Sequence, residues 1–394
     1  MEIAGDFRFE AMPLIFGTTR KSVKPFPLFR PHPLLRSGHA QTIVANYLPG
    51  APRLSVGETL HHVPLPDGDQ IVLHDDRPDN WSTGDPVALL LHGLGGSHRS
   101  SYLFRAARKL NQRGWRSFRM DYRTCGEGYG LARRSYHAGQ SDDVIAALRT
   151  IETCCPNSPI GLVGYSMGGN LALKAIGEFA DELPTTTMRA VVVNPALDLT
   201  ACCDYLTGPL QRLYDRHFAK SLISHVTKHS EFADLAPTLA EPPIMRIRDF
   251  DERFTVPQWG FETVDDYYRS ASAAPHLSRI TVPTLIIHSI DDPLIPPSLF
   301  SALNFSDAVS VHLTKHGGHL GFIGVGGVDA DRRWMDWRVV DWITGQIDAL
   351  QVAEANRPPF WRRWSGNGAS TTPAVITPAD VGVAAQTATE AAGR

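Results

Sequence analysis

Cysteine is scarce in this chain of 394 residues, which contains only five. They are Cys125, the adjacent pair Cys154 and Cys155, and the adjacent pair Cys202 and Cys203. An odd number that includes adjacent pairs is a poor basis for a disulfide framework and indicates a reducing compartment. The Cys-x-x-Cys spacing that is typical of zinc sites is also missing. We therefore expect a cytoplasmic protein without a structural zinc ion.

Long apolar runs and an excess of charge of one sign are missing as well. No stretch approaches the roughly 18 apolar residues of a membrane-spanning helix, so no integral membrane segment is predicted. The first residues are acidic where a secretory signal would be basic. A formal net charge of −3 gives no electrostatic basis for binding nucleic acid. With 43% hydrophobic and 20% charged residues, the composition is typical of a soluble globular protein.

Apolar runs alternate with helical patterns along most of the chain. The predicted strands are 60–63, 70–74, 87–91, 115–120, 160–163, 190–193, 284–288 and 309–313. The predicted helices between and after them are 102–113, 142–153, 171–179 and 334–349. Such alternation predicts an α/β fold, in which helices cover both faces of a mostly parallel central sheet.

The chain divides by composition into an N-terminal arm (1–57), a main domain (58–357) and a tail (358–394). About ninety residues separate the strands that end near 194 and begin near 284, where connections of a few residues are usual. Helical patterns at 205–227 and 264–272 lie in this stretch, so we expect a helical cap insertion over about 200–278. The tail is rich in Ala, Thr, Pro and Gly and is predicted to be disordered.

The segment from Ile160 to Asn170 contains a Gly-x-Ser-x-Gly motif centred on Ser166. An apolar run precedes the motif and a helical pattern follows it, which is the strand–turn–helix context that a nucleophilic serine requires. The turn is so sharp that glycine is needed two positions before and two positions after the serine. Ser166 is therefore the predicted nucleophile.

A serine hydroxyl attacks a carbonyl only if a base takes its proton. His319 is the predicted base, because it follows the last predicted strand and lies beside glycines that form a tight turn; His316 is the alternative. A carboxylate must then orient the imidazole. Asp292, in the loop after the strand 284–288, is the predicted partner, and Asp291 and Asp198 are alternatives. The order Ser…Asp…His is the one expected of α/β-hydrolases.

The oxyanion of a tetrahedral intermediate needs backbone N–H donors. Met167, directly after the nucleophile, is predicted to supply one of them. Leu94, in the glycine-rich loop after the strand 87–91, is predicted to supply the other. No Lys-Ser/Thr follows that loop as a phosphate-binding loop demands, and no set of histidines has a carboxylate at ligand spacing. We therefore expect neither an organic cofactor nor a metal ion.

Eight ordered stretches resemble the α/β-hydrolase superfamily, in particular its YheT-like branch of abhydrolase-domain esterases. They are Ser37–Ile43, Leu91–Tyr102, Arg113–Gly128, Arg134–Asp143, Gly164–Asn170, Ile247–Thr255, Ile286–Pro293 and His316–Gly324. In this resemblance the family's triad falls on Ser166, Asp292 and His319. Thr124 stands where the family usually has glycine. His137, Asp249 and Asp251 are interpreted as structural.

These features predict a serine carboxylic ester hydrolase whose partner is a small-molecule ester. The resemblance implies medium- or long-chain acyl esters. The apolar residues expected to line an acyl pocket in the cap are Leu206, Leu210, Leu213, Tyr214, Phe218 and Leu222. The alternatives are a catalytically idle hydrolase fold used for binding, and an acyltransferase or thioesterase with the same triad.

Overall fold

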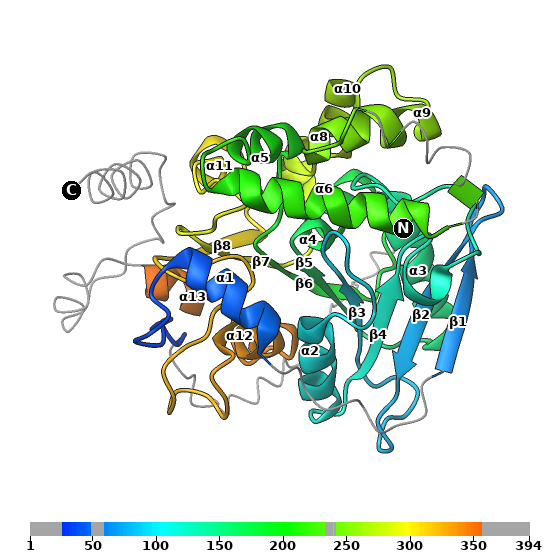
Figure 1. Ribbon diagram of the computed structural model, residues 1–394. Helices are drawn as coiled ribbons and strands as arrows, with labels where there is room; N and C mark the ends of the chain where they lie inside the picture. The colour runs from blue at the N-terminus through cyan, green and yellow to red at the C-terminus, as the bar shows by residue number, and fades with distance from the viewer. Residues whose placement is uncertain (1–25, 49–58, 230, 233–238, 240–241, 357–394) are drawn as a thin grey trace, which may run out of the picture.

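A single sheet of eight strands forms the centre of the molecule in the computed structural model, which describes residues 26–48, 59–229, 231–232, 239 and 242–356 (Figure 1). The strands lie in the order β1-β2-β4-β3-β5-β6-β7-β8. Their bounds are β1 Thr59–Pro64, β2 Gln70–Asp76, β3 Val87–Leu91, β4 Arg116–Asp121, β5 Ile160–Tyr165, β6 Thr187–Val193, β7 Thr284–Ser289 and β8 Val309–Thr314. β2 runs antiparallel to β1 and β4, and all other neighbours are parallel.

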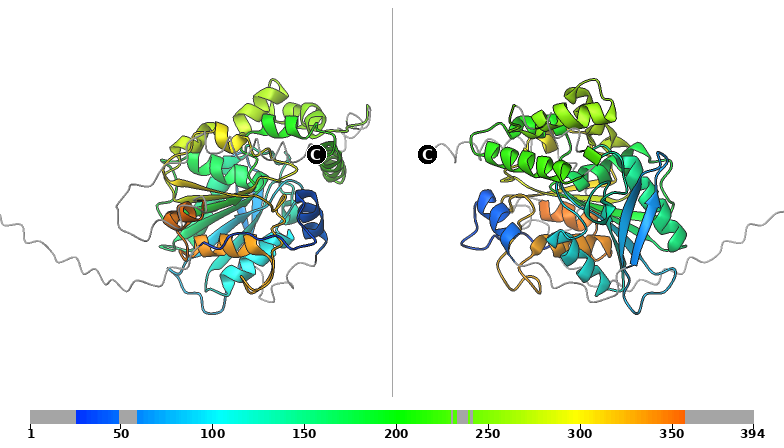
Figure 2. Two further views of the ribbon diagram at one scale, coloured as in Figure 1. Left: turned by 90° about the vertical axis from the view of Figure 1, so that its left-hand side faces the viewer. Right: turned by 45° about the vertical axis from the view of Figure 1, so that its right-hand side comes forward.

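The central strands are buried on both faces, as their continuous apolar runs require. Every residue of β3 is buried, and its side chains alternate between two cores. Val87 and Leu89 pack with α3 (Ser141–Cys154) and α4 (Met167–Glu178). Leu90 packs with α2 (Ser101–Asn111) and α12 (Trp334–Ile343) on the opposite face. The two helical layers are visible on either side of the sheet in Figure 2, which confirms the predicted fold class.

The long connection between β6 and β7 is largely helical. Its elements are α5 Leu199–Tyr205, α6 Gln211–Thr227, α8 Ile247–Phe250, η3 Asp251–Thr255, α9 Val256–Trp259, α10 Val264–Ala271 and η4 Ala274–Arg279. Figure 1 shows α6 as a long helix that passes across the edge of the sheet, with α8, α9 and α10 above it. The remaining elements are α1 Gly38–Tyr47, η1 Gly126–Gly128, α11 Leu299–Ala302 and α13 Ala349–Asn356.

Two of the predicted helices are wrong in their extent, because each is interrupted by residues that end a helix. The predicted helical stretch 205–227 starts too early, because α5 ends at Tyr205 and α6 begins only at Gln211, after a turn that contains Gly208 and Pro209. Proline lacks an N–H group and disfavours helical geometry in the residue before it. The predicted helix 334–349 ends at Ile343, and Gly345 follows with a φ of 71° before α13 begins.

Several expectations fall on residues that the structure does not describe. The predicted tail, 358–394, lies outside the described residues, and the predicted arm, 1–57, is described only over 26–48. The helical segment after β6 coincides with the part of the chain for which a cap is predicted, 200–278. None of the described helices has the length and apolar composition that crossing a bilayer requires.

Candidate active site

Ser166 lies on the turn between β5 and α4, with φ 54° and ψ −119°. This left-handed backbone conformation is rare for a residue with a side chain and costs of order 1–3 kcal/mol. Glycine is required on both sides of the turn. A Cβ atom on Gly164 would lie 2.5 Å from the carbonyl oxygen of Gly168, and one on Gly168 would lie 2.4 Å from that of His92. The two glycines thus allow the turn to pack closely against the neighbouring backbone. The turn presents the side chain of Ser166 at the end of β5.

His319 lies in the loop after β8 and contacts both other members of the predicted triad. Its Nε2 atom is 2.8 Å from Ser166 Oγ, and its Nδ1 atom is 2.8 Å from Asp292 Oδ2. Gly318, directly before it, has a φ of 57°, in the region that favours glycine. The ring of His319 is therefore in a position to accept the hydroxyl proton of Ser166 while Asp292 accepts the N–H bond at the other nitrogen.

Asp292 is completely buried in the loop after β7, and four donors face its carboxylate. The N–H groups of Leu294 and Ile295 contact Oδ1 at 2.8 and 3.2 Å. Asn194 Nδ2 and His319 contact Oδ2 at 2.7 and 2.8 Å. Burial by itself would raise the pKa of Asp292, but the neighbouring charge of His319 and its hydrogen bond hold that pKa below its ordinary value. The carboxylate is thus kept ionised beside the imidazole.

Asn194 is a fourth polar residue of the site that sequence reasoning missed. It follows β6 directly and has a φ of 46°. Besides donating to Asp292, it accepts a hydrogen bond from the N–H of Leu320 at 3.3 Å. Its amide therefore links the carboxylate to the loop that bears His319. Its place directly after a buried strand was a sequence signal for a residue at this edge of the sheet.

The alternative residues of the sequence analysis lie elsewhere. His316 Nδ1 is 3.4 Å from Asp291 Oδ2, so the two alternatives pair with each other and not with the predicted triad. Asp291 also accepts the N–H bond of Gly318 at 2.9 Å. Asp198 caps α5 by accepting the N–H bond of Ala201 at 3.0 Å. The first two residues thus support the turn before His319, and the third stabilises a helix end.

The N–H groups of Leu94 and Met167 are the two predicted oxyanion donors. Met167 is the first residue of α4, where a helix leaves its N–H groups without intrahelical partners. Among the described residues, neither of these two N–H groups donates to another atom of the chain. A Cβ atom on Gly93, beside Leu94, would lie 3.1 Å from the Cβ atom of Ser166. Both N–H groups are therefore unoccupied, and Met167 and Gly93, the neighbour of Leu94, adjoin the serine.

Two tyrosines fix the loop that carries Leu94. The hydroxyl of Tyr102 accepts the N–H bond of Gly93 at 2.9 Å, and that of Tyr136 accepts the N–H bond of Gly95 at 3.1 Å. The peptide N–H groups on both sides of Leu94 are thus occupied. Sequence reasoning missed these tyrosines, because nothing in their local pattern indicates which backbone group a hydroxyl will meet.

The N-terminal helix α1 supports the His319 loop from outside the sheet. Thr42 Oγ1 accepts the N–H bond of His319 at 2.8 Å. Gln41 is fully buried, and its side chain both donates to and accepts from the backbone of Ile323, at 3.1 and 2.7 Å. A Cβ atom on Gly38 would collide with the carbonyl oxygen of Asp291. The stretch Ser37–Ile43 thus packs directly against the loop that bears the histidine.

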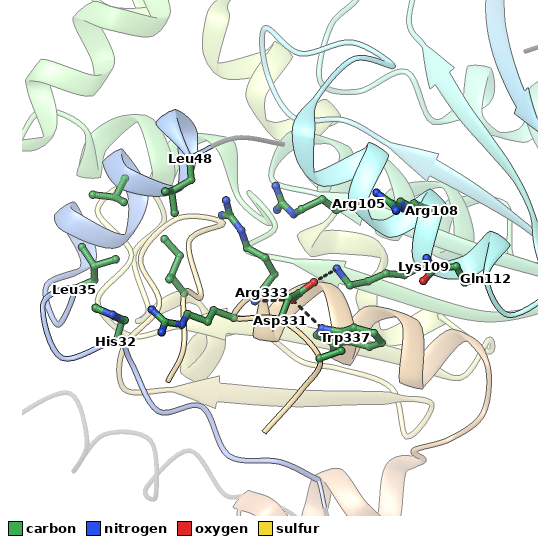
Figure 3. Close-up of a pocket in the computed structure, with 14 residues that line it drawn as sticks. His32, Leu35, Leu48, Arg105, Arg108, Lys109, Gln112, Asp331, Arg333 and Trp337 are labelled. Atoms are coloured by element: carbon green, nitrogen blue, oxygen red, sulfur yellow. Dashed lines mark hydrogen bonds and ion pairs between the residues drawn. The ribbon is translucent and has the colours of Figure 1, made fainter. Parts of the chain in front are cut away.

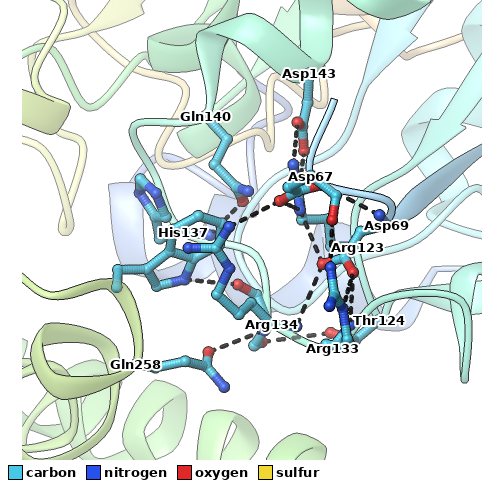
Figure 4. A network of polar contacts seen from close by, with 12 residues as sticks. Asp67, Asp69, Arg123, Thr124, Arg133, Arg134, His137, Gln140, Asp143 and Gln258 are labelled. Carbon is cyan, nitrogen blue, oxygen red and sulfur yellow. Dashed lines mark hydrogen bonds and ion pairs between the residues drawn. The ribbon is translucent and has the colours of Figure 1, made fainter. Parts of the chain in front are cut away.

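An ion-pair network holds the loop after β4 against the turn between β1 and β2 (Figure 4). The buried guanidinium of Arg123 donates two hydrogen bonds to Asp143, at 2.8 and 2.9 Å. Its third nitrogen contacts Asp69 at 2.9 Å and Asp67 at 2.5 Å. Thr124 follows Arg123 and has a φ of 61°. This backbone conformation favours glycine, which is the residue that the resemblance leads one to expect at this position.

The remaining residues singled out in the sequence have structural surroundings. His137 packs edge-on against Trp259, and burial lowers its pKa to about 3. Asp249 pairs with Arg246, and Asp251 accepts hydrogen bonds from Thr255 and Tyr268.

Of the predicted pocket residues, Leu206 and Leu222 are buried and Tyr214 and Phe218 are partly buried, but Leu210 and Leu213 are 58% and 66% exposed. The last two do not line an enclosed pocket.

One cluster among the described residues has the composition of a cation site, namely His74, His98 and Asp121. Both imidazoles contact the same carboxylate oxygen, at 2.9 and 2.6 Å, and their rings stack with centroids 3.5 Å apart. The carboxylate also accepts the N–H bonds of His98 and Glu127. It therefore ties the loops after β3 and β4 together, on residues separate from the triad.

Comparisons with known proteins show which family the chain resembles. A model of the alpha/beta hydrolase family matches residues 88–324. The chain is 33% identical to YheT of Escherichia coli, which is named as an esterase, over 72% of this chain and 84% of that protein. It is 28% identical to the human phospholipase ABHD3, over 73% of this chain and 71% of that one. An esterase structure from Pyrococcus furiosus has 14% identity and a TM-score of 0.51, covering 82% of this chain and 99% of that one.

Proposed function

The chain belongs to the α/β-hydrolase family, in the branch that contains YheT and ABHD3, and we propose that it is a serine carboxylic ester hydrolase. The observation that carries the proposal is the continuous set of contacts from Ser166 through His319 to Asp292, each at 2.8 Å. Three segments of the chain that are far apart in sequence supply a nucleophile, a base and an orienting carboxylate in hydrogen-bonding order. The esterase and phospholipase names of the relatives support the same reaction class.

In the proposed reaction, Ser166 Oγ attacks the ester carbonyl carbon as its proton moves to His319 Nε2. Asp292 remains ionised and stabilises the imidazolium that forms. The carbonyl electron pair moves onto oxygen, where the N–H groups of Leu94 and Met167 stabilise the negative charge. When the tetrahedral intermediate collapses, the proton passes from His319 to the leaving alkoxide. An alcohol departs and an acyl-enzyme remains.

Water completes the proposed cycle by the same route. His319 takes a proton from a water molecule, whose oxygen attacks the acyl carbon, and then returns the proton to Ser166 as the acid leaves. In a comparable oxyanion hole, one hydrogen-bond donor to the oxyanion lowers the activation free energy by about 2.7–4 kcal/mol. In the proposed site the free N–H groups of Leu94 and Met167 supply these donors, and the occupied N–H groups beside Leu94 hold its loop in place.

The proposed substrates are medium- or long-chain acyl esters, with the helices between β6 and β7 acting as a cap. The hydroxyl of Tyr205 on α5 is 3.4 Å from the carbonyl oxygen of Asp292. A Cβ atom on Gly95, next to Leu94, would lie 3.2 Å from Ser221 Oγ on α6. These contacts bring α5 and α6 to the mouth of the proposed site, and the partly buried Tyr214 and Phe218 give α6 an apolar side.

Active-site labelling with a fluorophosphonate tests the proposal directly. We expect the wild-type protein to be labelled and Ser166→Ala to be inert. His319→Gln should lose labelling, whereas the matched control His316→Gln should keep it, because His316 pairs with Asp291 instead. A folded wild-type protein that is not labelled would favour a catalytically idle fold used for binding.

A panel of p-nitrophenyl esters with acyl chains of graded length then tests the substrate class. We expect hydrolysis that favours medium or long chains and a loss of kcat on the order of 10⁶ in Ser166→Ala. Thioesters and an added acceptor alcohol, measured beside the panel, distinguish an ester hydrolase from a thioesterase or an acyltransferase. Faster turnover of either would contradict the proposed reaction while leaving the triad intact.

A further inference from the structure

A cavity separate from the triad lies between α1, α2 and the start of α12 (Figure 3). Its volume is about 720 Å³, far more than the roughly 30 Å³ that one water molecule occupies in the liquid. None of Ser166, Asp292 and His319 lines it. The residues that line it are His32, Leu35, Val44, Leu48, Arg105, Arg108, Lys109, Gln112, Ile323, Ala330, Asp331, Arg332, Arg333 and Trp337.

Positive charge exceeds negative charge in this cavity. Five of the lining residues are arginine or lysine, and Asp331 is the single acid among them. Arg105 and Lys109 are already neutralised, because Arg105 contacts Asp336 at 2.6 and 3.2 Å and Lys109 contacts Asp331 at 2.7 Å. Asp331 and Asp336 are thus engaged by the cations of α2.

Three guanidinium groups of the cavity, those of Arg108, Arg332 and Arg333, make no hydrogen bond and no ion pair with the described residues. Arg108 and Arg332 are exposed, where water is a sufficient partner. Arg333 differs, because its Nη1 atom is buried and makes no hydrogen bond. A buried donor without a partner destabilises the folded state, and more so when it is charged.

Arg333 also faces a like charge. Figure 3 shows the guanidinium groups of Arg333 and Arg105 side by side in the space between α1 and α2. Burial and the neighbouring charge of Arg105 lower the pKa of Arg333 by more than the carboxylates of Asp336 and Asp331 raise it. An anion that entered this space would supply the missing hydrogen bond and would offset the repulsion at the same time.

The charge and shape of the cavity indicate the kind of anion. The unpaired guanidinium of Arg333 suits a phosphate, which carries about −1.5 to −2 charges at neutral pH and accepts bidentate hydrogen bonds from arginine, and the exposed Arg108 and Arg332 add positive charge to the same cavity. The apolar residues of the lining are Leu35, Val44 and Leu48, on or beside α1, together with Ile323 and Trp337. We propose that this cavity is a binding site for a phosphate group attached to an apolar body.

Calorimetric titration with inorganic phosphate and with hexyl phosphate tests the site in a phosphate-free buffer. Hexyl phosphate contains no carboxylic ester, so its binding is independent of the proposed hydrolase activity, and the same titration on Ser166→Ala confirms that independence. We expect both probes to bind, with hexyl phosphate at least tenfold tighter, because burying two or three methylene groups suffices for that factor. Equal affinities would overturn the apolar part of the proposal, and no saturable binding would overturn all of it.

Variants locate the bound phosphate. Arg333→Gln should weaken binding of hexyl phosphate at least tenfold. The double variant Arg108→Gln/Arg332→Gln should do the same, and it changes only exposed side chains, so it tests the site even if Arg333→Gln folds poorly. The matched control is Arg279→Gln, an exposed arginine on η4 outside the cavity. Equal weakening in the control, or full binding in both cavity variants, would overturn the assignment.

Vesicles distinguish a lipid headgroup from a soluble phosphate ester. Sedimentation with phosphatidylcholine vesicles that contain phosphatidic acid, compared with phosphatidylcholine alone, measures binding to the headgroup. Binding that depends on phosphatidic acid and is lost in the cavity variants supports the site with a lipid as the source. If hexyl phosphate binds but vesicles do not, the site is supported and the phosphate group that it binds belongs to a soluble ester.

Discussion

Asn194 and Asp292, which follow the neighbouring strands β6 and β7, are joined by a 2.7 Å hydrogen bond from Asn194 Nδ2 to Asp292 Oδ2. The same oxygen contacts His319 Nδ1 at 2.8 Å. Because Asn194 also accepts the N–H bond of Leu320, one amide side chain holds both the carboxylate and the loop of the proposed base. We therefore infer that Asn194 is a positioning residue that acts through Asp292.

Asn194→Ala removes the donor from the buried carboxylate. A hydrogen bond to a charged group contributes about 1.5–3 kcal/mol, so we expect kcat for p-nitrophenyl ester hydrolysis to fall about 10- to 100-fold with KM little changed. The pH profile of kcat should shift as well, because the ionised carboxylate loses a stabilising bond. A variant with a lower melting temperature but an unchanged kcat and pH profile would show that Asn194 serves stability alone.

The adjacent acids Asp291 and Asp292 provide a matched pair. Asp292→Asn should lower kcat about 10⁴-fold, since an amide cannot hold the imidazole in the required tautomer. Asp291→Asn should lower kcat less than about tenfold, because Asp291 contacts His316 and the N–H group of Gly318 and not the ring of His319. Steady-state kinetics of the two variants checks this, and equal losses would contradict the assignment of Asp292.

The hydroxyl of Thr42 tests whether α1 positions the proposed base. Thr42→Val keeps the shape of the side chain but removes the acceptor for the N–H group of His319. We expect a two- to tenfold lower kcat, corresponding to the roughly 0.5–1.5 kcal/mol of one hydrogen bond, with KM unchanged. Thr42→Ser restores the hydroxyl and should recover most of the loss. Equal activity in the Val and Ser variants would exclude a positioning role for this hydroxyl.

Acid should destabilise the fold through histidines that are buried in their neutral form. Burial lowers the pKa of His312 to about 4, helped by the charge of Arg338, whereas an unfolded histidine titrates near 6.5. Between these two pH values the unfolded chain binds more protons than the folded chain. The contribution of His312 to the free energy of unfolding is therefore fully present above about pH 6.5 and is lost as the pH falls toward 4. His92, His225 and His288 share this direction, each with a pKa of about 4.

His312→Phe measures how much one of these histidines contributes to the pH dependence of the free energy of unfolding. The ring packs 4.5 Å from Phe26, centroid to centroid, and phenylalanine can keep that contact. We expect the free energy of urea unfolding to depend less steeply on pH between 6.5 and 4, by about one proton. The variant also loses the contact between His312 and Asn356, so its stability at pH 7 should be lower. An unchanged pH slope would mean that His312 does not titrate as inferred.

The sequence by itself determined the elements whose signals are local. The run Val87–Leu91 is apolar throughout and forms a strand with the predicted bounds, because such a run is stable only when it is buried on both faces. The glycines around Ser166 mark the sharp turn, since no other residue fits so close to the opposing backbone. The order of the proposed nucleophile, orienting carboxylate and base along the chain was also predicted from the pattern alone.

Only the tertiary structure decided which side chains meet. His316 and His319 lie in the same short loop, and Asp291 and Asp292 are adjacent, so the choice within each pair depends on the path of a loop. Asn194 and Thr42 reach the site from β6 and α1, more than a hundred residues of sequence away from the loop that they support. Contacts of this kind arise from the packing of whole elements, and no local propensity encodes them. The same holds for Arg333, whose Nη1 atom is buried and unpaired because α1, α2 and α12 meet around it.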